Sequence, residues 1–222
     1  MDSREETIVE IQYSLRQSIR DHMPLYVFVS VLFIMGIVFG ALLVNALSLE
    51  QKQEVTRYLG SFFHSIEQGV VGDAGYSFKT ALLGHLKWIL LIWLLGLSVV
   101  GLPLIMVLDF LKGVLIGFTV GYLVAQLSWK GLLFALVSVA PQNLIMIPSV
   151  IIASVAGITF SLFLIKNRFL QRSAGSVKQQ LASYAVTALA LLACVFAVSL
   201  FEVFISPHLM AWVTPHLIAV SS

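Results

Sequence analysis

The chain has 222 residues, of which 59% are hydrophobic and only 11% are charged, and its mean hydropathy is +0.97. Soluble domains carry about 25% charged residues, and a water-soluble fold could not cover its surface with so few polar groups. These values predict an integral membrane protein. A net charge of +2, with no basic run interleaved with aromatics, excludes nucleic acid as a partner.

Residues 1–24 are predicted to form an amphipathic helix on the cytoplasmic face of the membrane, because their apolar side chains recur at helical spacing. Those side chains are Ile8, Ile11, Leu15 and Ile19. Residues 25–47 form the first apolar run, and about 20 apolar residues cross a bilayer core as a helix. The polar residues ahead of this run favour a retained anchor over a cleaved signal peptide.

Residues 48–80 are predicted to form an extracytoplasmic loop with one or two short helices, the first capped by Ser48. The loop is large and mixes acidic with basic residues, so we expect it to present a surface to a partner protein. We place Glu202, near the outer end of the last span, on the same side. The residues predicted for this partner surface are Glu50, Glu54, Arg57, Glu67 and Glu202.

Residues 81–165 are predicted to hold membrane helices two to four. Their first block, residues 81–127, is too long for one span and must turn back. Gly and Pro within residues 101–103 offer one turn, and the charges of Asp109 and Lys112 offer another. We favour the turn at Asp109, which brings both charges to water. A turn at residues 101–103 would instead bury Asp109 and Lys112 as a pair within one helix.

The stretch VAPQNLIMIPSV lies inside the apolar block of residues 131–165. This block would form about 52 Å of straight helix, far more than one span needs. We therefore expect either one long kinked helix or a re-entrant segment followed by a span. Prolines remove backbone donors, and amides can bond the freed carbonyls or facing helices. We predict a polar cluster that faces protein at Pro141, Gln142, Asn143 and Pro148.

The loop of residues 166–180 carries four basic residues and no acidic one, which places it on the cytoplasmic side. Counting back through the apolar blocks gives five spans with the N-terminus inside and the C-terminus outside. Residues 181–205 form the fifth span, and residues 206–222 form an extracytoplasmic interfacial tail. His208 and His216 in this tail are interpreted as interfacial residues, since two histidines alone make a poor metal site.

Small residues recur four apart in two of the predicted helices, as GIVFG and GVLIGFTVG. Helices in a membrane associate largely through close backbone approach at such faces. The pattern favours packing within the chain over a seam between two protomers, and it leaves a homodimer open. The glycines concerned are Gly36, Gly40, Gly113, Gly117 and Gly121.

Enzyme signatures are missing from the sequence, which has no HExxH zinc motif, no GxSxG nucleophile elbow and no GxxxxGK[ST] phosphate loop. We therefore expect no catalytic residues, no metal site and no cofactor. Two classes of function remain. The chain is either a scaffold that binds partner proteins, or a channel- or transporter-like protein that acts as a homodimer around the broken fourth block.

Several long strings resemble the stage II sporulation protein M family of endospore-forming bacteria. They are LFIMGIVFGALLVNALSLEQKQE, FLKGVLIGFTVGYLVAQLSWKGLL, VSVAPQNLIMIPSV and FEVFISPHLM. The resemblance implies an all-α protein with five spans in the cytoplasmic membrane, placed at the sporulation septum and in the engulfing mother-cell membrane. It further implies a non-enzymatic scaffold that anchors and localises two peptidoglycan-degrading enzymes, stage II sporulation proteins D and P. No active-site residue is implied.

Overall fold

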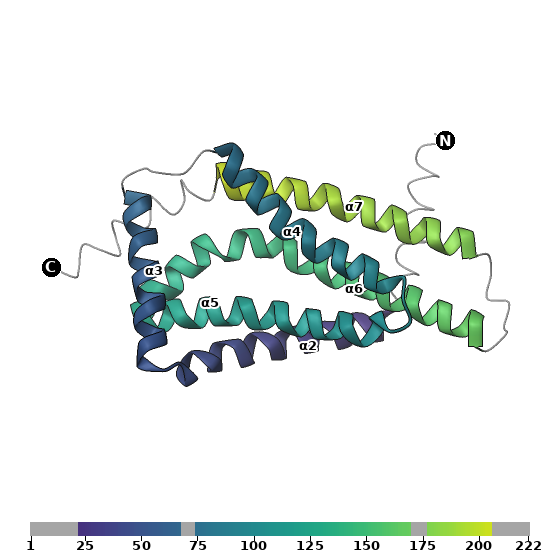
Figure 1. Ribbon diagram of the computed structural model, residues 1–222, viewed down its shortest axis with the longest axis horizontal. Helices are drawn as coiled ribbons and strands as arrows, with labels where there is room; N and C mark the ends of the chain where they lie inside the picture. Colours follow the sequence, from purple (N-terminus) through teal and green to yellow (C-terminus); the bar gives the residue numbers. More distant parts are fainter. Residues whose placement is uncertain (1–21, 68–73, 170–176, 206–222) are drawn as a thin grey trace, which may run out of the picture.

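The protein is described by a computed structural model, which covers residues 22–67, 74–169 and 177–205. Every element within these ranges is a helix (Figure 1). The predicted N-terminal amphipathic helix and the interfacial tail with His208 and His216 lie outside them. The elements in chain order are α2 (Met23–Leu43), the short 3-10 helix η1 (Val44–Ala46), α3 (Leu49–Glu67), α4 (Ala74–Gly96), α5 (Gly101–Ser138), α6 (Ala140–Phe169) and α7 (Val177–Phe204).

Five of these helices are long and apolar enough to cross a membrane, which confirms an all-α membrane protein with five predicted spans. They are Met23–Ala46, Phe78–Gly96, Gly101–Ser138, Ala140–Asn167 and Val177–Phe204. Figure 1 shows that the start of α2, the end of α6 and the start of α7 lie at one end of the bundle, and that α3 and the end of α7 lie at the other. The start of α2 therefore shares an end with Lys166 and Lys178, as the predicted placement of the basic loop requires.

The second apolar block turns at residues 97–100, between α4 and α5. Our preferred turn at Asp109 is therefore wrong, because Asp109 lies inside α5, two turns after its start. A side chain on Gly101 would strike the backbone of Leu95, so the tight turn needs a glycine there. Pro103 is tolerated in the first turn of α5, where backbone N–H groups have no helical acceptor.

The chain reverses direction at Ser128, within the range assigned to α5. Ser128 has φ 54° and ψ −132°, a conformation that interrupts the helix. After it, Gly131 packs against the backbone of Leu123, and Phe134 and Ala135 join Leu123 in a small apolar core. We call residues 129–138 the return segment. It runs back beside α5 before the chain bends again at Val139 and enters α6.

Helix α6 is the central helix of the bundle, because half of its most apolar window is buried, against 11–28% in the other four spans. It contacts α2, α4, α5 and α7. The main core forms where these helices meet, around Ile92, Ile105, Met146 and Val195. The outward side chains of the bundle are apolar too, as expected for helices that face lipid.

Helices α2 and α5 form the most extensive contact in the fold. The structure places all five motif glycines there, within one chain. A carbon added at Gly36 or Gly40 would strike a backbone carbonyl of α5, and one at Gly113 or Gly117 would strike a carbonyl of α2. At Gly121 it would lie 2.9 Å from Ala41 Cα. In this structure the motifs therefore form a seam between two helices of one chain, which is the packing that the sequence favours.

Candidate functional site

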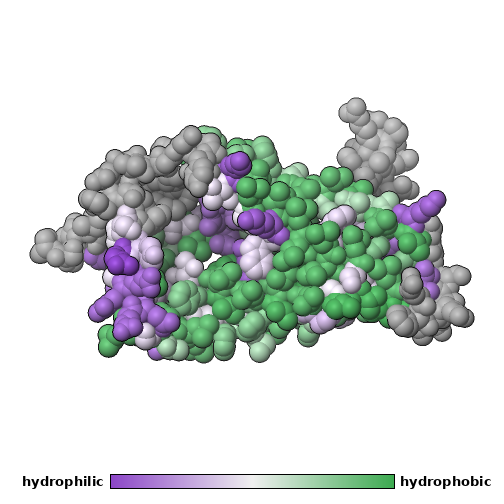
Figure 2. All heavy atoms as spheres, in the orientation of Figure 1, coloured by the Kyte–Doolittle hydropathy of each residue, from purple (hydrophilic) through white to green (hydrophobic). Residues whose placement is uncertain are grey.

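A polar cavity of about 520 Å³ opens between α4, α5 and α7. Helices α4 and α5 lie close together at the turn of residues 97–100, and the distance between them grows toward the N-terminus of α4 (Figure 1). Figure 2 shows hydrophilic side chains gathered in a hollow on this face, between apolar surfaces of the two helices. The lining residues are Thr80, Ala81, Gly84, His85, Trp88, Lys112 and Glu202.

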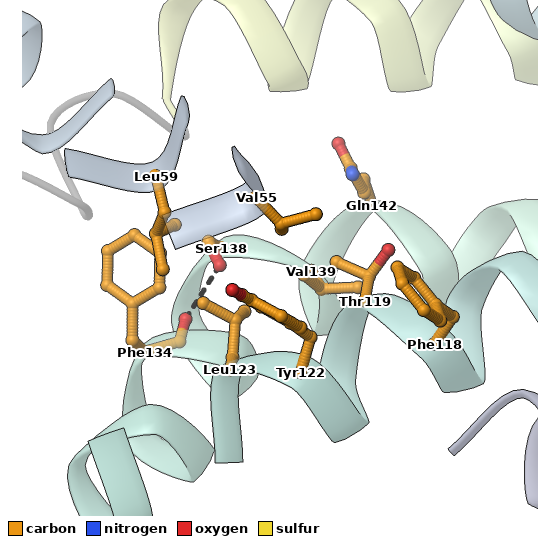
Figure 3. Close-up of a pocket in the computed structure, with 10 residues that line it drawn as sticks. All are labelled: Val55, Leu59, Phe118, Thr119, Tyr122, Leu123, Phe134, Ser138, Val139 and Gln142. Carbon is orange, nitrogen blue, oxygen red and sulfur yellow. Dashed lines mark hydrogen bonds between the residues drawn. The ribbon is translucent and has the colours of Figure 1, made fainter. Parts of the chain in front are cut away.

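His85 of α4 and Glu202 of α7 are hydrogen-bonded across the cavity, and the contact is an ion pair when His85 is protonated. Their Nε2 and Oε2 atoms are 2.7 Å apart, and the side chains are only 14% and 30% exposed. The amide of Gln142 on α6 completes this group when its nitrogen faces Glu202, opposite to the orientation drawn in Figure 3, because it then donates to both carboxylate oxygens at 3.2 and 3.3 Å. Three helices are thus joined at one carboxylate.

Lys112 supplies a positive charge to the same cavity from α5. Its Nζ lies over the ring of Trp88, 5.1 Å from the centroid, in a cation–π contact. Among the described residues Lys112 forms no ion pair, although the charge of Glu202 acts on it from the neighbouring wall. The cavity therefore holds one carboxylate that is bonded to its neighbours and one ammonium whose contact in the described part of the chain is an aromatic ring.

Asp109 and Lys112 do not form the buried pair that their spacing suggested. Asp109 is fully buried, and its Oδ1 accepts a hydrogen bond of 2.6 Å from Ser154 on α6. Its Oδ2 has no hydrogen-bond partner among the described residues. The carboxyl group thus binds α5 to α6, and within the described ranges it forms no ion pair, while Lys112 faces the cavity.

The predicted broken-helix cluster lies where the return segment joins α6. The break falls at Val139, and the side-chain nitrogen of Asn143 donates to the Val139 carbonyl at 2.8 Å. Gln142 reaches across to α7 instead. Pro148 lies inside α6, and Ser149 beside it donates back to the Ile145 carbonyl at 2.8 Å. One amide therefore bonds the broken backbone, and the other bonds a facing helix.

A second cavity of about 310 Å³ lies between α3, α5 and the return segment (Figure 3). It is mainly apolar, with Val55 and Leu59 of α3 facing Phe118 and Tyr122 of α5. The Tyr122 hydroxyl donates to the Lys52 carbonyl at 2.8 Å and lies 2.9 Å from the Thr56 hydroxyl. The other lining residues are Thr119, Leu123, Phe134, Ser138, Val139 and Gln142. Tyr122 therefore fixes α3 to the end of the bundle.

Helix α3 presents its charged side away from this cavity. Glu50, Glu54 and Arg57, three residues of the predicted partner surface, are exposed on it. Glu67 ends the helix, but its side chain is outside the described part of the structure. The structure places Glu202 elsewhere, between the membrane helices. The predicted surface is thus reduced to one face of α3.

Sequence reasoning missed the central group of the polar cavity. His85 and Glu202 are 117 residues apart, and no motif links them. An intramembrane ionisable residue is a site candidate by default. Applied to His85, that rule would have singled it out, because it lies within the span Phe78–Gly96.

Comparison with known proteins gives one match. A family model described as stage II sporulation protein M matches residues 29–207, which include every residue of the polar cavity and nearly all of the five spans. No curated protein and no solved structure matches the chain. Since the matched range covers most of the chain, this multi-pass membrane protein belongs to the stage II sporulation protein M family.

Proposed function

We propose that this sporulation-related protein is a non-enzymatic membrane scaffold which anchors and localises peptidoglycan-degrading enzymes during engulfment. Its partners are stage II sporulation proteins D and P, and its place is the cytoplasmic membrane at the septum and around the engulfed forespore. Its N-terminus lies inside and α3 lies outside, where the cell wall is. Family membership supports the link to sporulation, and the scaffold role is our inference.

The observation that carries the proposal is the mounting of α3. This amphipathic helix of 19 residues packs its apolar side on α5 and the return segment, and keeps its charged side exposed. Hydrogen bonds to Tyr122 attach it to α5. A charged helix attached to the outer end of the bundle is suited to binding another protein, because less ordering is needed when the partner arrives than for a free loop.

The experiment is co-purification of the full chain with proteins D and P after reversal of the three exposed charges of α3, in the variant E50K/E54K/R57E. We expect recovery of both enzymes to fall at least about tenfold, because like charges across an interface cost several kcal/mol. K178E, a charge reversal at the opposite end of the bundle, is the matched control and should leave recovery unchanged. Membrane insertion and the melting temperature of each variant are measured alongside.

Two results would overturn the scaffold proposal. One is failure of the wild-type chain to retain either enzyme in mild detergent. The other is undiminished recovery after residues 48–73 and 206–222 are both replaced by foreign sequence, since the predicted outer loop ahead of α4 and the predicted outer tail would then both be gone.

The polar cavity favours one alternative function, a channel- or transporter-like protein acting as a homodimer. The cavity has charged walls within the membrane region, which is where a solute or ion path would lie. Reconstitution of the purified chain into liposomes, with ion and solute flux compared between wild type and Asn143→Ala, distinguishes the two functions. Flux above that of empty liposomes, lost in the variant, would favour the alternative over the scaffold.

A further inference from the structure

The polar cavity lies on a side of the bundle that faces the bilayer. The helices run along the long axis of Figure 2, so the hollow is seen across the helices rather than down their ends. Exposed apolar side chains flank it on both helices, Leu83 on α4 and Val107 and Leu111 on α5. Acyl chains against the polar walls of this hollow would leave polar groups without partners, which is unfavourable in lipid. A polar group is therefore the expected occupant of the hollow.

The charges in the cavity indicate what that group is. The ionisable groups that face it are His85 from α4, Lys112 from α5 and Glu202 from α7. The oxygens of Glu202 already have hydrogen-bond donors in His85 and in the amide of Gln142. The Lys112 ammonium has three donors and rests on Trp88. An added anion would find its counter-charge at Lys112, whereas an added cation would have to displace His85.

We infer that this cavity binds the phosphate of an anionic phospholipid headgroup, with the Lys112 ammonium donating to the phosphate oxygens. A cavity of 520 Å³ has room for a phosphodiester and several ordered waters. The headgroup enters sideways between α4 and α5, and its acyl chains remain against the apolar flanks. The inference does not depend on the scaffold proposal, and a scaffold with this site would respond to the lipid composition of its membrane.

The test is native mass spectrometry of the full chain released from micelles that contain phosphatidylglycerol or phosphatidylcholine. We expect the wild type to retain phosphatidylglycerol in preference to phosphatidylcholine. K112Q should retain at least about tenfold less phosphatidylglycerol, since a charge-assisted hydrogen bond contributes about 1.5–3 kcal/mol. K112R should retain it. The matched control is K87Q, which removes an exposed lysine beside Trp88 that does not line the cavity.

A second readout is independent of mass spectrometry. Brominated phosphatidylglycerol should quench the fluorescence contributed by Trp88, taken as the difference between the wild type and Trp88→Phe, and this quenching should disappear in K112Q. Melting temperatures establish that K112Q is folded, and K112R provides the binding-competent comparison if it is not.

Three results would overturn the inference. Equal phosphatidylglycerol retention by K112Q and K87Q would show that Lys112 does not bind the lipid. Equal retention of both lipids by the wild type would show that the site does not select an anionic headgroup. The third is a Lys112-dependent rise in melting temperature with inorganic phosphate, without retention of lipid, which would assign the cavity to free phosphate.

Discussion

The seam between α2 and α5 makes Gly117→Ala the most informative test of the fold. The added carbon would strike the carbonyl oxygen of Ile37 and would lie 2.7 Å from Ile37 Cα, whereas ordinary van der Waals contact begins at 3.4 Å. The obstructing atoms are backbone, so no side chain can rotate away. The two helices must therefore move apart by more than about 0.7 Å, because the carbonyl oxygen is closer still than Cα, and such a gap forfeits at least about a quarter of each dispersion contact nearby.

We expect Gly117→Ala to lower the free energy of unfolding by about 2–3 kcal/mol, at the upper part of the range for overpacked cores. The measurement is unfolding in mixed micelles, followed by circular dichroism or by steric trapping. Gly84→Ala is the matched control, because a carbon added at Gly84 on α4 meets no atom within 4 Å. Replacing a helical glycine by alanine there should be neutral, or stabilising by up to about 1 kcal/mol.

The reasoning is refuted if Gly117→Ala and Gly84→Ala unfold alike. It is also refuted if Gly117→Ala leaves the stability of the chain unchanged but halves its mass in detergent, because the glycine face would then hold two protomers together. A decrease in stability at constant mass is the result that an intrachain seam requires.

Two further predictions concern single polar groups. Ser154→Ala removes the one hydrogen bond that the described residues give the buried Asp109 carboxyl, so it should destabilise the chain by about 1–3 kcal/mol in the same unfolding assay. Ser149→Ala, which removes a bond to a carbonyl of its own helix, should be near neutral. Equal effects of the two substitutions would contradict the bridge between Ser154 and Asp109. Ser128→Gly should stabilise the chain by about 1 kcal/mol, because a φ of 54° is strained for a residue with a side chain but not for glycine. The melting temperature measures this effect. A lower melting temperature in the variant would show that the chain does not reverse at Ser128.

The features that were predicted correctly from the sequence are properties of single helices. Composition, run length and loop charge require no knowledge of neighbours, and they led to five spans and to a break near Pro141. The reversal at Ser128 was not predicted, because serine is not a residue that typically adopts positive φ. The apolar contact between Leu123 and the return segment offsets the backbone strain at Ser128.

Polar residues were harder to place, because their partners lie on other helices. The predicted turn at Asp109 rests on the reasoning that a charged residue in a span should reach water. The structure satisfies Asp109 with Ser154, 45 residues away, and a sequence gives no sign of such a bond. Glu202 shows the same difficulty, since its nearness to the end of a span suggested the outer surface, whereas His85 and Gln142 hold it between helices.

Gln142 gives the break at Val139 a consequence beyond local geometry. Its side chain lines the apolar cavity beneath α3, and its amide can bond the carboxylate that closes the polar cavity. A continuous helix through this point would carry α6 straight on from the return segment, and Gln142 would then turn away from the cavity or from Glu202. The proline that follows the break disfavours that continuation. The break thus lets one side chain line the cavity beneath α3 and bond a carboxylate of the other cavity.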